Sequence, residues 1–217
     1  MALFIYNPRV LKYVKDVLRN YDLRCYVPRD VSKVKDSDVL IVDSEGLRIL
    51  HSTVGNNLPR YFLVNGDDAS IYRPILNAYG IKEVKVIQVG IDVGKRLAYV
   101  VLCDGVLLRA GYAGSLRELI NSINLLNNYL RPSKVIIKIG GYVDELEIHL
   151  LKNHLQRNCE VFLIDEQKSS AKSQLNLCGL KIKFTDDIHA ALNIALRDGI
   201  KLEFAAENPT SRAGTYT

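Results

Sequence analysis

Apolar and polar residues along positions 1–84 alternate in a pattern that predicts short strands separated by amphipathic helices. Asn7-Pro8 begins the first predicted helix, in which apolar residues recur with a period close to 3.6. A second helix is predicted over 69–81, interrupted by Pro74 and ended by Gly80. The four apolar runs predicted as strands are 3–6, 23–27, 39–43 and 61–65. Strands that alternate with helices indicate a small parallel α/β unit.

The pattern changes near Val84, where three strand-like runs follow one another without a helix between them. Asp104-Gly105, between the second and third runs, is a strong signal for a tight hairpin. Beyond it, helices and strands alternate. The predicted elements are strands 84–92, 97–103 and 106–112, a helix after Ser115, strand 134–140, helix 143–156, strand 160–165 and helix 186–199. This order, β-β-β-α-β-α-β-α with an antiparallel meander first, resembles the ribonuclease H-like fold.

Two units are therefore predicted, with no low-complexity linker between them. Residues 1–84 form a small α/β domain of unknown role, and residues 85–202 form a ribonuclease H-like mixed sheet. The tail, 203–217, is small and polar and is expected to fray. The first unit has no phosphate-binding glycine fingerprint, so docking or homodimerisation is its expected role. Its stretch 43–46 follows a strand, where open α/β sheets bind ligands.

Composition adds little to this picture. The chain has 217 residues and a net charge of +5, which is spread over both units and permits nucleic-acid binding without arguing for it. The four cysteines are far apart and form no zinc motif. The chain start lacks the features of a signal peptide, and no apolar run reaches the length of a membrane span. We therefore expect a soluble, cytoplasmic protein.

Isolated carboxylates fall at strand ends and at a helix start in the second unit. Asp92 ends the first strand, Asp165 and Glu166 end the last one, and Asp186-Asp187 open the final helix. The small residues that follow in this helix would let it lie close to a sheet. Converging carboxylates raise one another's pKa unless a cation lies between them, and Mg²⁺ (or Mn²⁺) suits such a site. The glycines beside Asp92 are expected to let a substrate backbone approach.

Three sequence blocks make a resemblance specific. The stretches 89-VGIDVGKRLAYVVL-102, 164-IDEQKSSAKS-173 and 187-DIHAALNIAL-196 occur in order and are similar to the motifs of the YqgF family, the RuvX-like Holliday junction resolvases. Like that family, the chain has no acid in the strand 135–141, where Lys138 stands instead. Two features depart from the family: Gln167 replaces an arginine, and the basic pair Lys95-Arg96 is one residue nearer the aspartate. Residues 1–84 lie outside the resemblance.

The resemblance implies a metal-dependent nuclease that hydrolyses phosphodiester bonds in structured nucleic acid, either Holliday junctions or precursor RNA. It implies Asp92, Glu166 and Asp187 as catalytic metal ligands, with Asp165 as a competitor for the second place. The side chains it implies as contacts to the nucleic acid are Lys95, Arg96, Ser169 and Ser170.

Other interpretations stay open at this point. Asp92 could cap a turn, Asp165-Glu166 could be a solvated strand end, and Asp186-Asp187 could cap any helix. The protein could have kept the fold and lost the chemistry, as a nucleic-acid-binding or scaffold protein. In that case, a salt bridge from Lys138 or Lys95 into the acid cluster would put a protein cation in the metal's place. GIDVGK also resembles the first phosphate loop of actin-like ATPases, but those need a second domain of the same kind.

Overall fold

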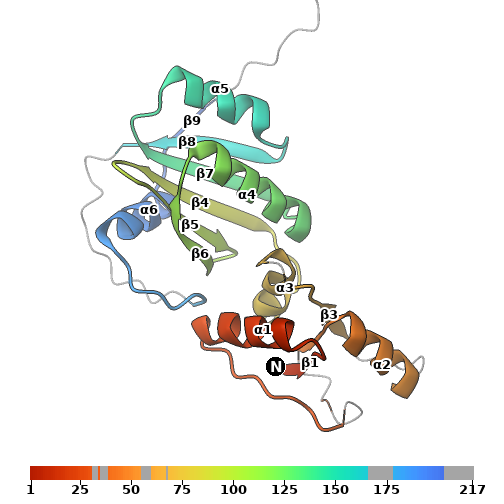
Figure 1. Ribbon diagram of the computed structural model, residues 1–217. Helices are drawn as coiled ribbons and strands as arrows, with labels where there is room; N and C mark the ends of the chain where they lie inside the picture. Colours follow the sequence, from red (N-terminus) through yellow and green to blue (C-terminus); the bar gives the residue numbers. More distant parts are fainter. Residues whose placement is uncertain (31–33, 35–38, 55–59, 67, 166–177, 203–217) are drawn as a thin grey trace, which may run out of the picture.

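The computed structural model describes residues 1–30, 34, 39–54, 60–66, 68–165 and 178–202 and contains two sheets (Figure 1). The N-terminal sheet is parallel, with strand order β1-β2-β3. This confirms the small parallel α/β unit. Its elements are β1 (Ala2–Phe4), α1 (Pro8–Asn20), β2 (Leu40–Val42), α2 (Ser44–Val54), β3 (Tyr61–Leu63) and α3 (Asp68–Ala78).

The C-terminal sheet is mixed, with strand order β6-β5-β4-β7-β8-β9. Strands β4, β5 and β6 form an antiparallel meander, β7 and β8 run parallel to β4, and β9 is antiparallel. A meander on one side of the central strand and parallel strands on the other is the ribonuclease H-like arrangement. Its elements are β4 (Val86–Val93), β5 (Leu97–Cys103), β6 (Val106–Ala113), α4 (Leu116–Leu130), β7 (Lys134–Gly141), α5 (Glu145–His154), β8 (Cys159–Ile164), α6 (Asp186–Leu196) and β9 (Ile200–Lys201).

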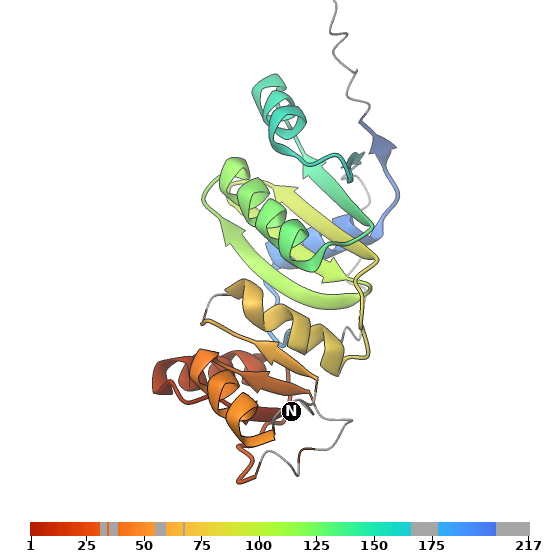
Figure 2. The same ribbon diagram turned by 90° about the vertical axis from the view of Figure 1, so that its right-hand side faces the viewer.

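Helices cover both faces of this sheet (Figures 1 and 2). The buried residues of α4, together with Leu151 of α5, pack on one face. Helix α6 packs on the other face, against β4, β5 and β7. No helix in the described ranges is both long and apolar enough to cross a lipid bilayer.

Local sequence signals explain most of these elements. Asp104 and Gly105 both have positive φ, 46° and 85°, which confirms the tight hairpin between β5 and β6. The Asp104 carboxylate also accepts hydrogen bonds from the backbone N–H groups of Lys85 and Val86, each at 2.9 Å. These bonds hold the hairpin against the start of β4. At the start of α4, the Ser115 side chain accepts the N–H of Glu118, as expected of an N-cap.

One predicted strand is wrong. Of residues 23–27, only Tyr26 pairs with the sheet, in a single bridge to Ala2. Asp22 has a left-handed backbone that turns the chain directly after α1, and Pro28 has no N–H to extend a ladder. Helix α2 and the short strand β9 were not predicted.

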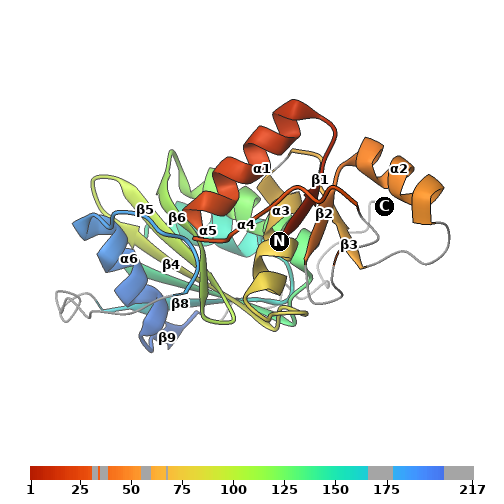
Figure 3. The ribbon, with the colours of Figure 1, turned by 90° about the horizontal axis from the view of Figure 1, so that it is seen from below.

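The two halves share one hydrophobic core, which includes buried residues of α1, α3, β4 and α4. Hydrogen bonds also join them: the Tyr21 hydroxyl donates to the Leu108 carbonyl at 2.5 Å, and the Lys181 N–H donates to the Asn20 carbonyl at 2.6 Å. Figure 3 shows α1 and α3 on the side of the N-terminal unit that faces the larger sheet. The described parts of residues 1–84 and 85–202 are therefore packed directly on each other.

Candidate acidic site at the end of the central strand

Asp92 lies on the face of β4 that α6 covers. Ile87, Val89 and Ile91 are fully buried in the core on the other face, so the alternation of a strand directs Gly90 and Asp92 toward α6.

Register then shows which residues lie beside Asp92. Asp92 is aligned with Ala98 of β5, which is aligned with Tyr112 of β6. On its other side, Asp92 is aligned with Gly140 of β7. Residues aligned across neighbouring strands share a face, so Tyr112 also lies on the α6 side of the sheet.

Gly90 lets α6 lie directly against β4. A Cβ atom at this position would be 2.0 Å from the Ala191 carbonyl oxygen and 2.6 Å from the Ala195 nitrogen. The expectation that small residues let this helix approach the sheet is confirmed. The expectation that Gly90 admits a substrate backbone is wrong, because the helix backbone already fills that space. Gly94 is different: the nearest atom to its added Cβ is the Arg96 carbonyl oxygen at 3.9 Å.

Asp187, in the first turn of α6, is held by residues from the hairpin and from β6. Its Oδ2 accepts from Arg96 Nη2 at 3.1 Å and from the Tyr112 hydroxyl at 3.2 Å. The Tyr112 hydroxyl lies 2.7 Å from Thr185 Oγ1, the N-cap of α6, and the Arg96 guanidinium lies 4.3 Å from the centre of the Tyr112 ring. We call Arg96, Tyr112, Thr185 and Asp187 the Asp187 network.

The Asp187 network is open to solvent, with side-chain exposures of 65% for Arg96 and 41% for Asp187. An exposed ion pair contributes about 1 kcal/mol or less, so Arg96 can leave Asp187 at little cost. Sequence reasoning placed Arg96 and Asp187 in the site but missed Tyr112 and Thr185. Counting register outward from the predicted hairpin would have placed Gly111 beside Ala98, because a β-bulge near Val101 shifts the observed pairing by one residue and brings Tyr112 there instead.

Asp165 reaches the same end of the sheet. It follows Ile164, which is aligned with Gly140, the β7 neighbour of Asp92, and its side chain is exposed. Asp92 near the end of β4 and Asp165 just after β8 therefore lie at the same end of the sheet, with β7 between their strands. The start of α6 lies at this end as well. Within the described ranges, no group of three or more His, Cys, Asp or Glu side chains could hold a metal ion. Three of the predicted site residues, Glu166, Ser169 and Ser170, lie outside the described residues, as does Gln167.

Lys138 does not enter the acidic site. It is aligned with Gly90, is 8% exposed, and its ammonium donates to the Arg197 carbonyl just beyond α6. Burial lowers the pKa of Lys138, and the nearby Asp198 carboxylate opposes this. Among the described residues, Arg96 is the cation that pairs with Asp187, and neither Lys138 nor Lys95 does so.

The donor set is compatible with Mg²⁺. Mg²⁺ is bound in proteins by one or two carboxylates and keeps several waters. Asp92 and Asp187 could supply two carboxylates from one face of the sheet. Because Arg96 and Tyr112 engage one oxygen of Asp187, an ion that used this oxygen would have to displace Arg96.

No family model matches this sequence, and no curated protein does. Solved structures that overlap with it include Argonaute from Marinitoga piezophila with 5′ OH guide RNA (13% identity, TM-score 0.30) and with guide RNA and target DNA (14%, 0.31), and Aquifex aeolicus Argonaute (13%, 0.29). Each match covers 76% of this chain but only 39%, 39% and 35% of the Argonaute chains. Overlaps this slight support no conclusion, so the fold assignment rests on strand order and direction.

Proposed function

We propose that this protein is a metal-dependent nuclease, similar to the YqgF family, that hydrolyses phosphodiester bonds in structured nucleic acid. One observation carries the proposal: Asp92, Asp165 and the Asp187 network lie at one end of the six-stranded sheet. The three sequence blocks of the YqgF resemblance supply these same acids. Holliday junctions and precursor RNA are the substrates that the resemblance implies.

The residues of the site have distinct roles in this proposal. Asp92, Asp187 and Glu166 hold Mg²⁺ or Mn²⁺, with Asp165 as the alternative to Glu166. The bound ion would supply an activated water and neutralise charge on the phosphate. Arg96 leaves Asp187 and donates to a phosphate oxygen, because a guanidinium pairs with phosphate as well as with carboxylate. Lys95, Ser169 and Ser170 are the other proposed contacts to the nucleic-acid backbone.

A second candidate is a nucleic-acid-binding or scaffold protein without catalysis. The Arg96–Asp187 ion pair favours it, because a protein cation already neutralises one of the acids. An actin-like ATPase has less support, since the N-terminal sheet has three parallel strands instead of a second mixed sheet of this kind. A homodimer through residues 1–84 stays a prediction, and so does a location in the cytoplasm.

Asp92→Asn tests the proposal most directly. We expect wild-type protein with Mg²⁺ or Mn²⁺ to cleave at least one of labelled four-way junction, flap, duplex or RNA substrates. The substitution removes one negative charge from the site, so we expect cleavage to fall by at least about a hundredfold. Asp16→Asn is the matched control, because Asp16 is an exposed residue on α1. A wild type that binds these substrates but cleaves none, with Asp92→Asn binding equally well, would identify the non-catalytic candidate.

Arg96→Gln separates the two candidates by metal binding alone. The substitution removes the cation that competes for Asp187, so Mn²⁺ should bind about three- to fivefold more tightly, as expected for loss of an exposed ion pair. Calorimetric titration with Mn²⁺ measures this without any nuclease activity. Arg48→Gln is the control, because Arg48 forms an exposed ion pair with Glu45 on α2. Unchanged Mn²⁺ affinity in Arg96→Gln would mean that Asp187 is not a metal ligand.

A further inference from the structure

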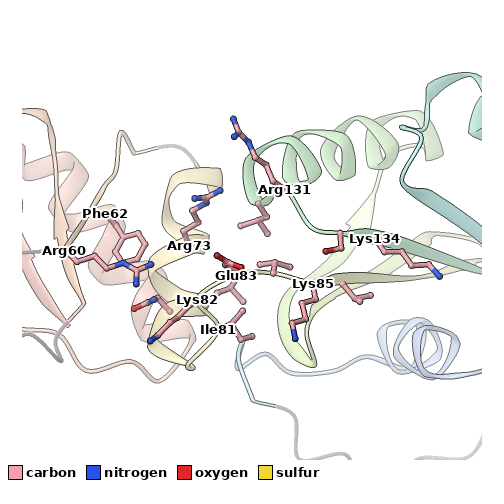
Figure 4. A pocket seen from close by; sticks show the side chains of 15 residues that line it. Arg60, Phe62, Arg73, Ile81, Lys82, Glu83, Lys85, Arg131 and Lys134 are labelled. Carbon is pink, nitrogen blue, oxygen red and sulfur yellow. The ribbon is translucent and has the colours of Figure 1, made fainter.

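A cavity of about 640 Å³ lies between the two units, away from the acidic site (Figure 4). Its walls come from β3 and α3 of the N-terminal unit, the connecting segment 81–85, the end of α4 and the start of β7. The cavity adjoins Val86, the first residue of β4, whereas Asp92 is near the end of the same strand. At 3.3 Å per residue, about 20 Å of β4 separates the two places.

The lining of this cavity is strongly basic. It contains one carboxylate, Glu83, and six cationic side chains: Arg60, Arg73, Lys82, Lys85, Arg131 and Lys134. In Figure 4, Glu83 lies near the middle of the group, with Arg60, Arg73 and Lys82 toward the left, Lys85 and Lys134 toward the right, and Arg131 above. Arg60, Arg73 and Lys82 belong to the N-terminal unit, and the other three cations belong to the larger unit. The excess of positive charge is therefore shared between the two units and lies where they meet.

Half of these cations are already engaged within the protein. Lys134 forms an ion pair with Glu160 at 2.7 Å, and Arg73 donates to the Tyr129 carbonyl at 2.8 Å. The Arg60 guanidinium lies 5.6 Å from the centre of the Phe62 ring. The other three, Lys82, Lys85 and Arg131, are exposed and form no ion pair with any described residue.

The backbone that carries two of these unpaired cations is well fixed. The Lys85 N–H donates to the Asp104 carboxylate at 2.9 Å, and Arg131 is the left-handed C-cap of α4, with its N–H bonded to the Asn127 carbonyl at 2.8 Å. Like charges held close together repel one another, and a bound anion relieves that repulsion.

The cations are spread around the cavity and do not converge on one point, so they suit several phosphates in a chain better than a single anion. Arginine and lysine are the main donors to nucleic-acid phosphates. Apolar lining from Phe62, Leu76 and Ile81 offers contact surface for sugars or bases. We propose that this cavity binds the sugar–phosphate backbone of nucleic acid, at a place separate from the acidic site. The choice of nucleic acid among polyanions rests on the proposed function.

Neutralising the three unpaired cations tests the proposal. The variant Lys82→Gln/Lys85→Gln/Arg131→Gln is compared with wild type by fluorescence anisotropy on labelled duplex DNA, single-stranded DNA and RNA over a range of salt concentrations. We expect the dissociation constant for the bound substrate to rise at least about tenfold at low salt. For a duplex, a plot of the logarithm of the association constant against the logarithm of the salt concentration should become less steep by about two to three. Each lost phosphate contact reduces the steepness of this slope by about 0.9.

The matched control removes the same charge elsewhere. Lys12→Gln/Arg117→Gln/Lys183→Gln replaces exposed residues of α1, α4 and the segment before α6, none of which lines the cavity. Its salt slope should stay within about one of the wild-type slope. Equal losses in the two triple variants would overturn the proposal, because binding would then follow net charge and not this cavity.

Glu83→Gln gives a test in the opposite direction. Removing the carboxylate from the middle of the cations should tighten binding about threefold, which a damaged protein would not do. Unchanged or weaker binding in this variant would contradict the placement of phosphates beside Glu83.

Cleavage assays on the same proteins separate this proposal from the nuclease. If the cavity variant binds like wild type while Asp92→Asn abolishes cleavage, the cavity proposal is wrong and the nuclease stands. If the cavity variant loses binding but wild type cleaves nothing, the cavity proposal stands and the nuclease is wrong. Wild-type binding to heparin but to no nucleic acid would overturn the cavity proposal, because the ligand would be another polyanion.

Discussion

Gly90→Ala is expected to lower the free energy of unfolding by about 3 kcal/mol or more, the largest effect we predict for a single methyl group. The added Cβ would lie 2.0 Å from the Ala191 carbonyl oxygen and 2.6 Å from the Ala195 nitrogen, both backbone atoms of α6. A helix backbone cannot rotate away as a side chain can, so α6 would have to lift off β4. Urea denaturation followed by circular dichroism measures the loss.

Gly94→Ala is the matched control, because Gly94 lies four residues after Gly90 in the stretch GIDVG. Its added Cβ would have no neighbour closer than 3.9 Å, and its stability should stay within about 0.5 kcal/mol of wild type. A Gly90→Ala protein as stable as Gly94→Ala would mean that α6 does not lie on β4 as described.

Asp43→Ala is expected to cost about 3 kcal/mol of stability, because three backbone donors lose their acceptor. Asp43 is 4% exposed, and its carboxylate accepts the N–H groups of Tyr6 at 3.1 Å, Asn7 at 2.7 Å and Gly46 at 2.7 Å. These bonds fasten the loop after β1 to the start of α2. Thermal denaturation should show the loss.

The control for this substitution is Asp16→Ala, on the exposed surface of α1, which should change stability by no more than about 0.5 kcal/mol. Comparable losses at the two positions would contradict the role of Asp43. The position of Asp43, after β2 of an open sheet, is one where ligands bind in other α/β proteins. Here, the Asp43 carboxylate accepts three backbone N–H groups of the protein itself, in place of a donor from a ligand.

The larger sheet could be predicted well because its strands are long and their turns are distinctive. Three mostly apolar segments that form strands of seven or eight residues, together with the Asp104-Gly105 turn, predicted the meander, and helical periodicity identified α4. The N-terminal unit was harder, since its strands contain only three residues each. At that length an apolar run such as 23–27 cannot be told from a strand, and β9, with two exposed residues, leaves almost no pattern.

The candidate site was only partly predictable, for a different reason. Asp92 stands out because a carboxylate is unusual at a strand end next to an apolar run, and Asp187 stands out because it opens the final helix within the third block of the resemblance. Tyr112 and Thr185 do not stand out in the sequence, because their part in the site depends on strand register and on the position of α6. The basic cavity was missed because its cations extend from Arg60 to Lys134 in the chain, and an evenly spread charge of +5 does not reveal a local concentration.

The hydrogen bond between Tyr21 and Leu108 joins residues that are 87 positions apart, and it has a consequence for the newly synthesised chain. Burial beside the larger sheet raises the pKa of the Tyr21 phenol, so this side chain belongs to the joint interior of both units. When the first 84 residues emerge from a ribosome, neither β6 nor α4 exists to cover them. The N-terminal unit, although made first, therefore completes its packing only after the meander and α4 have been translated.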